Sequence, residues 1–97
     1  MKIDKQLNDA SLTVSLEGRL DTTTAPELES DLHNLEGITH LVLDFSKLDY
    51  ISSAGLRVLL AAHKAMLKQG DMKIIHANVL VQEVFDVAGF SDILTIE

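Results

Sequence analysis

The chain has 97 residues, 46% of them hydrophobic, and carries a formal net charge of −7. A chain of this length forms one hydrophobic core, so we expect a single domain over residues 1–97. The acidic balance argues against binding to nucleic acid or to an anionic membrane surface, since both need clustered Lys and Arg side chains. No cysteine is present, which excludes disulfides and thiolate metal sites.

The same composition gives expectations about location. No apolar run reaches the length of a membrane-spanning helix. Residues 1–4 lack the apolar core of a secretory signal. We therefore expect a cytoplasmic domain.

The first two predicted elements form a β-hairpin. Residues 3–7 alternate weakly, and residues 12–17 alternate Leu or Val with polar side chains, which is the period of a half-buried strand. The turn signal between them is residues 8–10, Asn-Asp-Ala. Residues 18–21, Gly-Arg-Leu-Asp, close the second strand.

A first helix follows. Thr24 and Glu27 have the spacing of a capping box, and Pro26 between them suits a first helical turn. Gly37 is placed to end this helix as a left-handed cap. Three leucines recur at helical spacing and predict its buried face: Leu28, Leu32 and Leu35.

Residues 38–45, apolar at almost every position after His40, predict a central strand, which we expect to be covered on both faces. A polar connection, residues 46–50, then leads to Ser52 and Ser53 at the start of a long helix. Gly70 ends that helix. One face of the helix carries Leu56, Leu59, Leu60, His63 and Leu67.

The remaining sequence predicts a strand at 72–76, a third helix, and a final strand at 92–96. Asn78 is a suitable N-cap for the third helix and Gly89 a suitable C-cap. Its expected buried stripe is Leu80, Val84, and Val87 or Ala88.

The predicted element order is therefore β-β-α-β-α-β-α-β. Strand–helix–strand units of this spacing pair in parallel through right-handed crossovers, and the opening hairpin adds an antiparallel strand. The sequence thus predicts an α/β fold with a mixed sheet and helices packed mainly on one face.

An enzymatic site finds little support in the residues. A serine hydrolase needs a nucleophile, a base and an orienting acid together. Residues 51–55, Ile-Ser-Ser-Ala-Gly, do not form the Gly-x-Ser-x-Gly elbow. The four histidines stand singly, without metal-ligand spacing, and no Gly-rich phosphate loop exists. We expect no enzymatic activity, no metal and no cofactor.

The two serines at the start of the second helix allow two interpretations. Both can be capping residues, which is the commonest reason for Ser at this place. Alternatively, Ser53 in the first turn can carry a phosphate, adding about −1.5 to −2 charges beside the positive end of the helix dipole. The residues alone do not separate these interpretations.

At these residues the chain resembles a known family, the STAS domain, and specifically the small stand-alone anti-sigma factor antagonists of bacteria. The resemblance begins with GRLD at residues 18–21. It is strongest over residues 41–56, LVLDFSKLDYISSAGL, and continues in VFDVAGF at residues 84–90. These three motifs in this order cover essentially the whole chain.

The resemblance implies a partner-switching regulator. In the family, an anti-sigma factor that is also a serine kinase phosphorylates a serine at the start of the second helix, and a phosphoserine phosphatase reverses this. Only the unphosphorylated antagonist binds the anti-sigma factor. Aligned on Gly55, the acceptor is Ser53, with Ser52 as a rival hydroxyl. Ser52 replaces the usual acidic residue, and Ala54 replaces the usual hydroxyl residue.

The resemblance further implies a partner surface around the acceptor and a monomer in the free state. Asp21 matches an aspartate of the family and is expected to shape this surface rather than to catalyse. Two alternatives remain: a STAS module of a transporter or signalling complex without phosphorylation, and a small hydrolase that uses Ser53. The residues expected at the partner surface are Asp21, Thr22, Ser52, Ser53, Ala54, Gly55 and Arg57.

Overall fold

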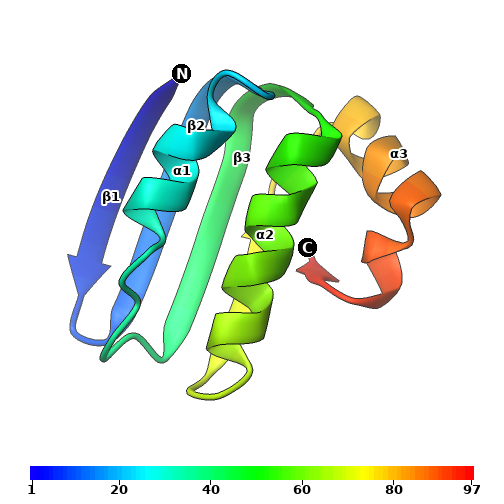
Figure 1. The fold of residues 1–97 in the computed structure, drawn as a ribbon. Coiled ribbons are helices and arrows are strands. Elements are labelled where there is room, and N and C mark those ends of the chain that lie inside the picture. Colours follow the sequence, from blue (N-terminus) through cyan, green and yellow to red (C-terminus); the bar gives the residue numbers. More distant parts are fainter.

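A computed structural model describes residues 1–97 as a five-stranded sheet with three α-helices and one short 3₁₀-helix (Figure 1). Along the chain these are β1 (Lys2–Asn8), β2 (Ser11–Leu20), α1 (Ala25–Asp31), β3 (His40–Ile51), α2 (Ser53–Met66), β4 (Asp71–Ile75), α3 (Val79–Ala88), η1 (Phe90–Asp92) and β5 (Thr95–Ile96). None of the helices is both long and apolar enough to cross a membrane.

The sheet has the strand order β1-β2-β3-β4-β5. β1 pairs with β2 antiparallel, and every other pair is parallel. The hairpin turn lies at Asp9 and Ala10, and Asp9 has a positive φ of 54°. Asp and Asn tolerate this left-handed conformation better than most residues. The predicted hairpin and mixed sheet are therefore confirmed.

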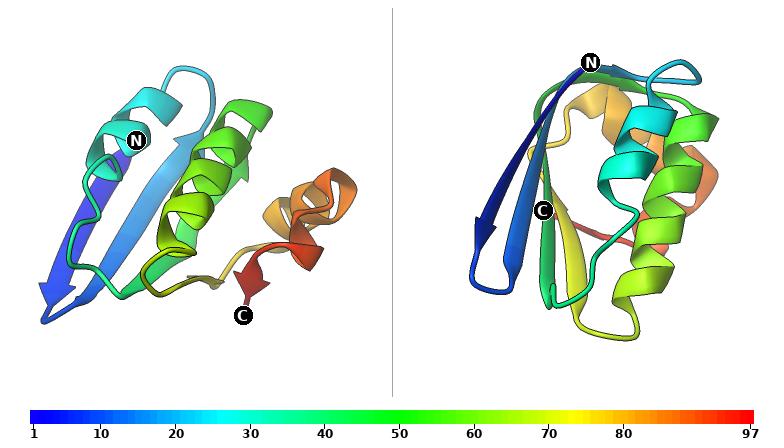
Figure 2. Two further views of the ribbon diagram at one scale, coloured as in Figure 1. Left: turned by 60° about the horizontal axis from the view of Figure 1, so that its bottom comes forward. Right: turned by 60° about the vertical axis from the view of Figure 1, so that its left-hand side comes forward.

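The helices cover one face of this sheet, and the other face is uncovered (Figure 2). In β3, Leu41, Leu43 and Phe45 are fully buried, while Val42 and Asp44 point to the uncovered face and are half-buried. The prediction that this strand is covered on both faces was wrong. The two-residue period of a one-sided strand is hidden in the sequence, because an apolar valine occupies position 42 on the uncovered face, where a polar residue is expected.

β3 also continues through the segment that the sequence predicts as a polar connection. Leu48 and Ile51 are buried within it, and the strand ends only at Ile51. Its pairing with β2 shifts register twice, between Ser15 and Glu17 and again between Gly18 and Arg19. Such irregularities bend a strand and re-aim its side chains. The shifts explain why strand periodicity is lost there.

α1 begins and ends differently from its prediction. Thr24 is the N-cap residue, but its side chain makes no capping bond, so the predicted capping box does not form. The helix ends at Asp31, and Gly37, with φ of 82°, lies in the following loop rather than at the helix end. The three predicted leucines are nevertheless all buried: Leu28, Leu32 and Leu35.

α2 buries the side that faces the sheet, including Leu56, Leu59 and Met66. Leu67, predicted on this face, is exposed because the buried face runs through Ala62 and Met66 instead. The C-terminal elements also differ. The last strand is only Thr95–Ile96, and η1 occupies part of the segment that the sequence assigned to it.

α3 has the predicted caps but a different buried stripe. The Asn78 side chain accepts a hydrogen bond from the Val81 amide at 2.8 Å, and Gly89 is a left-handed C-cap. The fully buried residues are Val81 and Phe85, whereas Leu80 is exposed. Phe85 stacks on Phe45 and on Phe90, with ring centroids 6.4 and 6.5 Å away. These aromatic contacts fix the rotation of α3.

Candidate functional site

The β2–α1 loop and the β3–α2 junction meet at one end of the sheet. β2 and β3 are parallel, so their C-terminal ends lie side by side, and Leu20 is paired with Ile51. The Ser52 amide donates a hydrogen bond to the Leu20 carbonyl at 2.9 Å. The structure thus brings the Asp21 loop next to the serines, as the sequence predicts.

Gly55 allows α2 to begin this close to the strands. A Cβ atom at Gly55 would lie 2.6 Å from Cγ of Leu20 and 2.9 Å from Cγ1 of Ile51. Both of these side chains are fully buried and have no room to move aside. Gly55 is therefore a packing residue beneath the site, and its side of the helix is not available to a partner.

The two serines have opposite environments. Ser52 is the N-cap of α2, as expected, but its hydroxyl makes no capping bond, and its Oγ is buried without a hydrogen-bond partner. Ser53 is exposed in the first turn of the helix. The hydroxyl of Ser53 is therefore open to another protein, and that of Ser52 is not.

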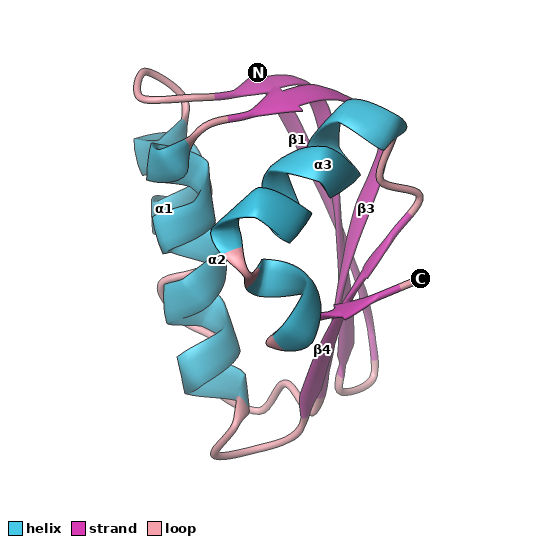
Figure 3. Ribbon diagram, turned by 90° about the vertical axis from the view of Figure 1, so that its right-hand side faces the viewer, coloured by secondary structure: helices cyan, strands magenta, loops and turns pink.

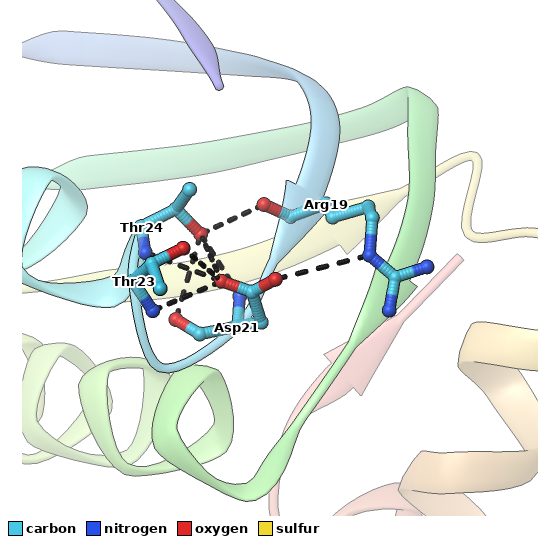
Figure 4. Close-up of polar contacts among 4 residues, drawn as sticks. All are labelled: Arg19, Asp21, Thr23 and Thr24. Carbon is cyan, nitrogen blue, oxygen red and sulfur yellow. Dashed lines mark hydrogen bonds and ion pairs between the residues drawn. The ribbon is translucent and has the colours of Figure 1, made fainter.

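The Asp21 carboxylate organises its own loop (Figure 4). Its Oδ1 accepts hydrogen bonds from the Thr23 hydroxyl at 2.7 Å and the Thr23 amide at 3.0 Å. The Thr24 hydroxyl accepts from the Asp21 amide at 2.9 Å and donates to the Arg19 carbonyl at 2.7 Å. The hydrogen bonds from Thr23 hold the pKa of the Asp21 carboxyl below its ordinary value. Asp21 is thus a charged, loop-forming residue.

Arg19 links this loop to β3. Its Nε lies 3.8 Å from Oδ2 of Asp21, and its guanidinium carbon lies 4.5 Å from the centre of the Tyr50 ring. An arginine over an aromatic ring is attracted to the face of that ring. In the sequence, Arg19 and Tyr50 stand out only as members of two separate motifs. Their contact depends on the β2–β3 register, which sequence spacing does not give.

Two grooves flank the start of α2. The first, the α1–α2 groove, has a volume of about 480 Å³. It contains the predicted residues Thr22, Ala54 and Arg57 and is otherwise rich in small side chains. Its full lining is Thr22, Ala25, Pro26, Glu29, Leu32, His33, Ala54, Arg57, Val58, Ala61, Ala62 and Ala65.

The second, the α2–α3 groove, has a volume of about 430 Å³. Both predicted serines border it, so the start of α2 forms the ridge between the two grooves. Its lining is mostly apolar and contains no histidine: Tyr50, Ile51, Ser52, Ser53, Leu56, Leu80, Glu83, Val84, Val87 and Ala88.

The contribution of α3 to this site was not predicted from the sequence. Leu80, Val84 and Val87 were predicted as a buried stripe, yet they form one wall of the α2–α3 groove. The available signal was the breadth of the apolar arc on α3. Counting Val81 and Phe85, that arc is wider than one packed face of a helix requires.

No group of three or more His, Asp or Glu side chains is arranged to hold a metal ion. Two carboxylates lie near the serines: Asp21, which accepts hydrogen bonds within its own loop, and Glu83, which borders the α2–α3 groove. The arrangement therefore offers an exposed hydroxyl, a rigid loop and two grooves, which together suit recognition by another macromolecule.

The STAS domain family matches residues 2–97, and the chain belongs to this family. It is 36% identical to the anti-sigma factor antagonist BtrV of Bordetella bronchiseptica, over 99% of this chain and 85% of that protein. It is 29% identical to the anti-sigma-B factor antagonist of Bacillus subtilis, over 99% of this chain and 90% of that protein.

Solved structures show the same fold at low identity. An anti-sigma factor antagonist from Thermotoga maritima superposes with a TM-score of 0.89 and 17% identity, covering 97% of this chain and 84% of that one. The Bacillus protein SpoIIAA in its phosphorylated form gives a TM-score of 0.77 at 14% identity, covering 99% of this chain and 91% of that one. The predicted α/β fold with a mixed sheet is confirmed.

Proposed function

We propose that this protein is an anti-sigma factor antagonist that acts by binding rather than by catalysis. In this proposal it binds an anti-sigma factor with serine kinase activity while Ser53 is unphosphorylated, and releases it once Ser53 is phosphorylated. A phosphoserine phosphatase restores the binding form. The names of the two relatives support the antagonist role, and the exposure of Ser53 supports the switch.

The observation that carries the choice of acceptor is the contrast between the serines. A kinase must bring its ATP to the hydroxyl, and the Oγ of Ser52 is buried while Ser53 is exposed. Ser53 also lies in the first turn of α2, where the helix dipole stabilises a negative charge. The helix therefore accommodates a phosphate there without unfolding, and the main effect falls on the partner.

The effect on the partner is electrostatic and steric. A phosphate adds about −1.5 to −2 charges. An interface formed around the unmodified helix start would have to desolvate those charges, which is costly without matched partners. The Asp21 loop, with Thr22, and the exposed Arg57 complete the proposed contact surface beside Ser53.

The acceptor is tested by incubating the protein with ATP and the anti-sigma kinase of its source organism, and then measuring its intact mass. The wild type should gain one phosphate, Ser52→Ala should gain it equally, and Ser53→Ala should gain none. A phosphate on Ser52 would contradict the assignment. No mass gain with a kinase that modifies another substrate would favour the alternative of a STAS module without phosphorylation.

The switch is tested by isothermal titration calorimetry against the same kinase. Ser53→Ala should bind like the wild type, since a small side chain at an exposed position removes no contact that binding needs. Ser53→Asp should bind at least about tenfold more weakly. Equal affinity of Ser53→Asp and the wild type would overturn the partner switch.

A further inference from the structure

Ser53 and Arg57 are neighbours on the exposed ridge of α2. This helix runs between α1 and α3 on the covered face of the sheet (Figure 1), and Figure 3 shows α3 beside it. Ser53 borders the α2–α3 groove and Arg57 borders the α1–α2 groove, and both residues are exposed. They are four residues apart in one uninterrupted helix, which places them one above the other on the same face.

The guanidinium of Arg57 has no ion-pair partner in the unmodified protein. α2 contains no Asp or Glu, and none of the four ion pairs of the structure involves Arg57. Three of its four neighbours at helical spacing are apolar: Ala54, Leu60 and Ala61. The fourth is Ser53, whose hydroxyl is uncharged. The ridge thus holds a cation that gains an anionic neighbour only when Ser53 is phosphorylated.

The direction of helical side chains favours this pair. Long side chains on a helix lean towards its N-terminus, so Arg57 leans towards the turn that carries Ser53. A negative residue four positions before a positive one is the favourable order for an ion pair on a helix. A guanidinium can also donate two parallel hydrogen bonds to one phosphate.

We propose that Arg57 binds the phosphate of Ser53 within the same chain, and that phosphorylation thereby withdraws Arg57 from the surface that contacts the anti-sigma factor. The proposed switch then changes that surface at two points, because a negative group appears at Ser53 and the positive group of Arg57 becomes occupied. This inference rests on the proposed function and names the residue through which the modification acts.

Arg19 is the competing phosphate-binding residue, but its surroundings oppose that role. Its Nε already lies 3.8 Å from the Asp21 carboxylate, and its guanidinium carbon lies 4.5 Å from the centre of the Tyr50 ring. Arg19 also precedes the buried Leu20 in β2, and successive residues of a strand point to opposite faces of the sheet. Arg19 therefore leaves the sheet on the uncovered face, whereas Ser53 belongs to a helix on the covered face.

The ion pair is tested by phosphorus NMR on the whole chain, with phosphoserine incorporated in place of Ser53 during translation, so that no kinase is needed. Phosphoserine ordinarily has a second pKa of about 6, and a neighbouring guanidinium lowers this pKa by favouring the dianion. The second pKa should lie at least about 0.2 pH units below that in Arg57→Gln. Arg57→Lys should restore part of the difference, because it keeps the charge but loses the paired donors.

Lys64→Gln is the matched control for this titration. Lys64 is exposed on the same helix and carries the same charge, but lies about 16 Å along the helix axis from Ser53. Its replacement should leave the pKa of the phosphate unchanged. Equal pKa values with and without Arg57 would overturn the ion pair. A rise of the pKa in Arg19→Gln, with none in Arg57→Gln, would assign the phosphate to Arg19 and also overturn it.

Other charged groups face the phosphate or Arg57, and the comparison between variants accounts for them. They are Glu83 from α3, Asp21 from the β2–α1 loop, and Glu29 and His33 from α1. The carboxylates raise the pKa of a phosphate, and they are present in every variant. Imidazole titrates in the same pH range as phosphoserine. Each titration is therefore repeated with His33→Gln, and the effect of Arg57 should remain.

The withdrawal of Arg57 is tested by calorimetry with the purified anti-sigma factor. A phosphate on Ser53 should weaken binding at least about tenfold in the otherwise unchanged protein. Unphosphorylated Arg57→Gln should already bind at least about fivefold more weakly than the wild type. Its further loss on phosphorylation should be at least about threefold smaller, because the guanidinium contributes to binding only before modification. Lys64→Gln should behave like the wild type, and an equal loss on phosphorylation with and without Arg57 would overturn the withdrawal.

The outcomes separate this inference from the proposed function. Equal pKa values of the phosphate with and without Arg57, together with loss of binding by Ser53→Asp, would overturn the ion pair and leave the switch intact. A pKa that Arg57 lowers, together with full binding by Ser53→Asp, would overturn the switch and the withdrawal of Arg57, and would keep the ion pair.

Discussion

At the scale of single residues, three residues at the start of α2 have different structural roles. Ser52 connects the helix to β2 through its backbone amide, Ser53 presents a hydroxyl to solvent, and Gly55 packs against Leu20 and Ile51. Each task depends on where the residue points, which the geometry of one helical turn determines. The site is therefore compact, and each of its residues can be altered separately in experiments.

Ser52→Ala is expected to leave the protein as stable as the wild type or to stabilise it by up to about 1 kcal/mol. Replacing an N-cap serine that makes its capping bond by alanine lowers the stability of a protein by about 1 kcal/mol. The hydroxyl of Ser52 makes no such bond, and an unpartnered buried hydroxyl is itself unfavourable. Urea unfolding measures the difference. A loss of more than about 1 kcal/mol would show that the hydroxyl has a partner in solution.

Gly55→Ala is expected to destabilise the protein by about 1–3 kcal/mol, the usual cost of overpacking a filled core. Helix propensity alone predicts the opposite sign, a gain of about 0.5–1 kcal/mol. Ala61→Gly, on the exposed part of the same helix, is the control for propensity and should lose about 0.5–1 kcal/mol. Stabilisation by Gly55→Ala in urea unfolding would contradict the close packing.

At the scale of elements, α3 shows what sequence periodicity can and cannot predict. Its caps at Asn78 and Gly89 were predicted correctly, because capping depends on neighbours in the chain. Its buried face was predicted one residue out of phase. The chain has only three phenylalanines, and the stacking of Phe85 between the other two sets the rotation. That contact joins residues far apart in sequence, so local spacing does not reveal it.

The rotation of α3 about its axis can be tested by measuring the stability of two variants. Phe85→Ala should destabilise the protein by about 3–5 kcal/mol, because it leaves a cavity in the core. Val87→Ala should change stability by no more than about 0.5 kcal/mol, because that side chain is almost fully exposed. The predicted stripe leaves Phe85 outside the buried face and therefore requires only a small loss at Phe85. Urea unfolding of the two variants therefore distinguishes the two rotations of the helix.

The same reasoning explains the other differences between sequence and structure. The predicted capping box at Thr24 failed because the Thr24 hydroxyl is already bonded to Arg19 and Asp21 in the loop. The end of β3 was missed because the register shifts against β2 disturb its alternation. The predicted proximity of the Asp21 loop and the serines is observed, because parallel strands bring their C-terminal ends together.

At the scale of the whole molecule, the sheet has one face in the core and one face in solvent. The 25 buried hydrophobic residues form one cluster, and no polar or charged residue is buried. The excess of 15 acidic over 8 basic residues is consequently a property of the surface. A net charge of −7 produces a field that extends beyond the contact surface itself.

Association with a basic partner should therefore depend on salt. Raising the NaCl concentration from about 0.05 to 0.5 M should slow association at least about tenfold and change dissociation much less, because steering acts before contact. Stopped-flow kinetics with the purified anti-sigma factor measures both rates. An association rate that is independent of salt would show that the acidic surface does not attract the partner.

The separation between Ser53 and Gly55 has a consequence for how such a regulator can change by mutation. Ser53 is exposed, so a substitution there would alter the proposed response to a kinase at little cost to folding. Gly55, two residues later, admits no larger side chain without disturbing the core. The proposed regulation and the fold can thus change separately, although both depend on residues of the same helical turn. A lineage could therefore gain or lose the proposed phosphorylation switch in one step and keep the fold.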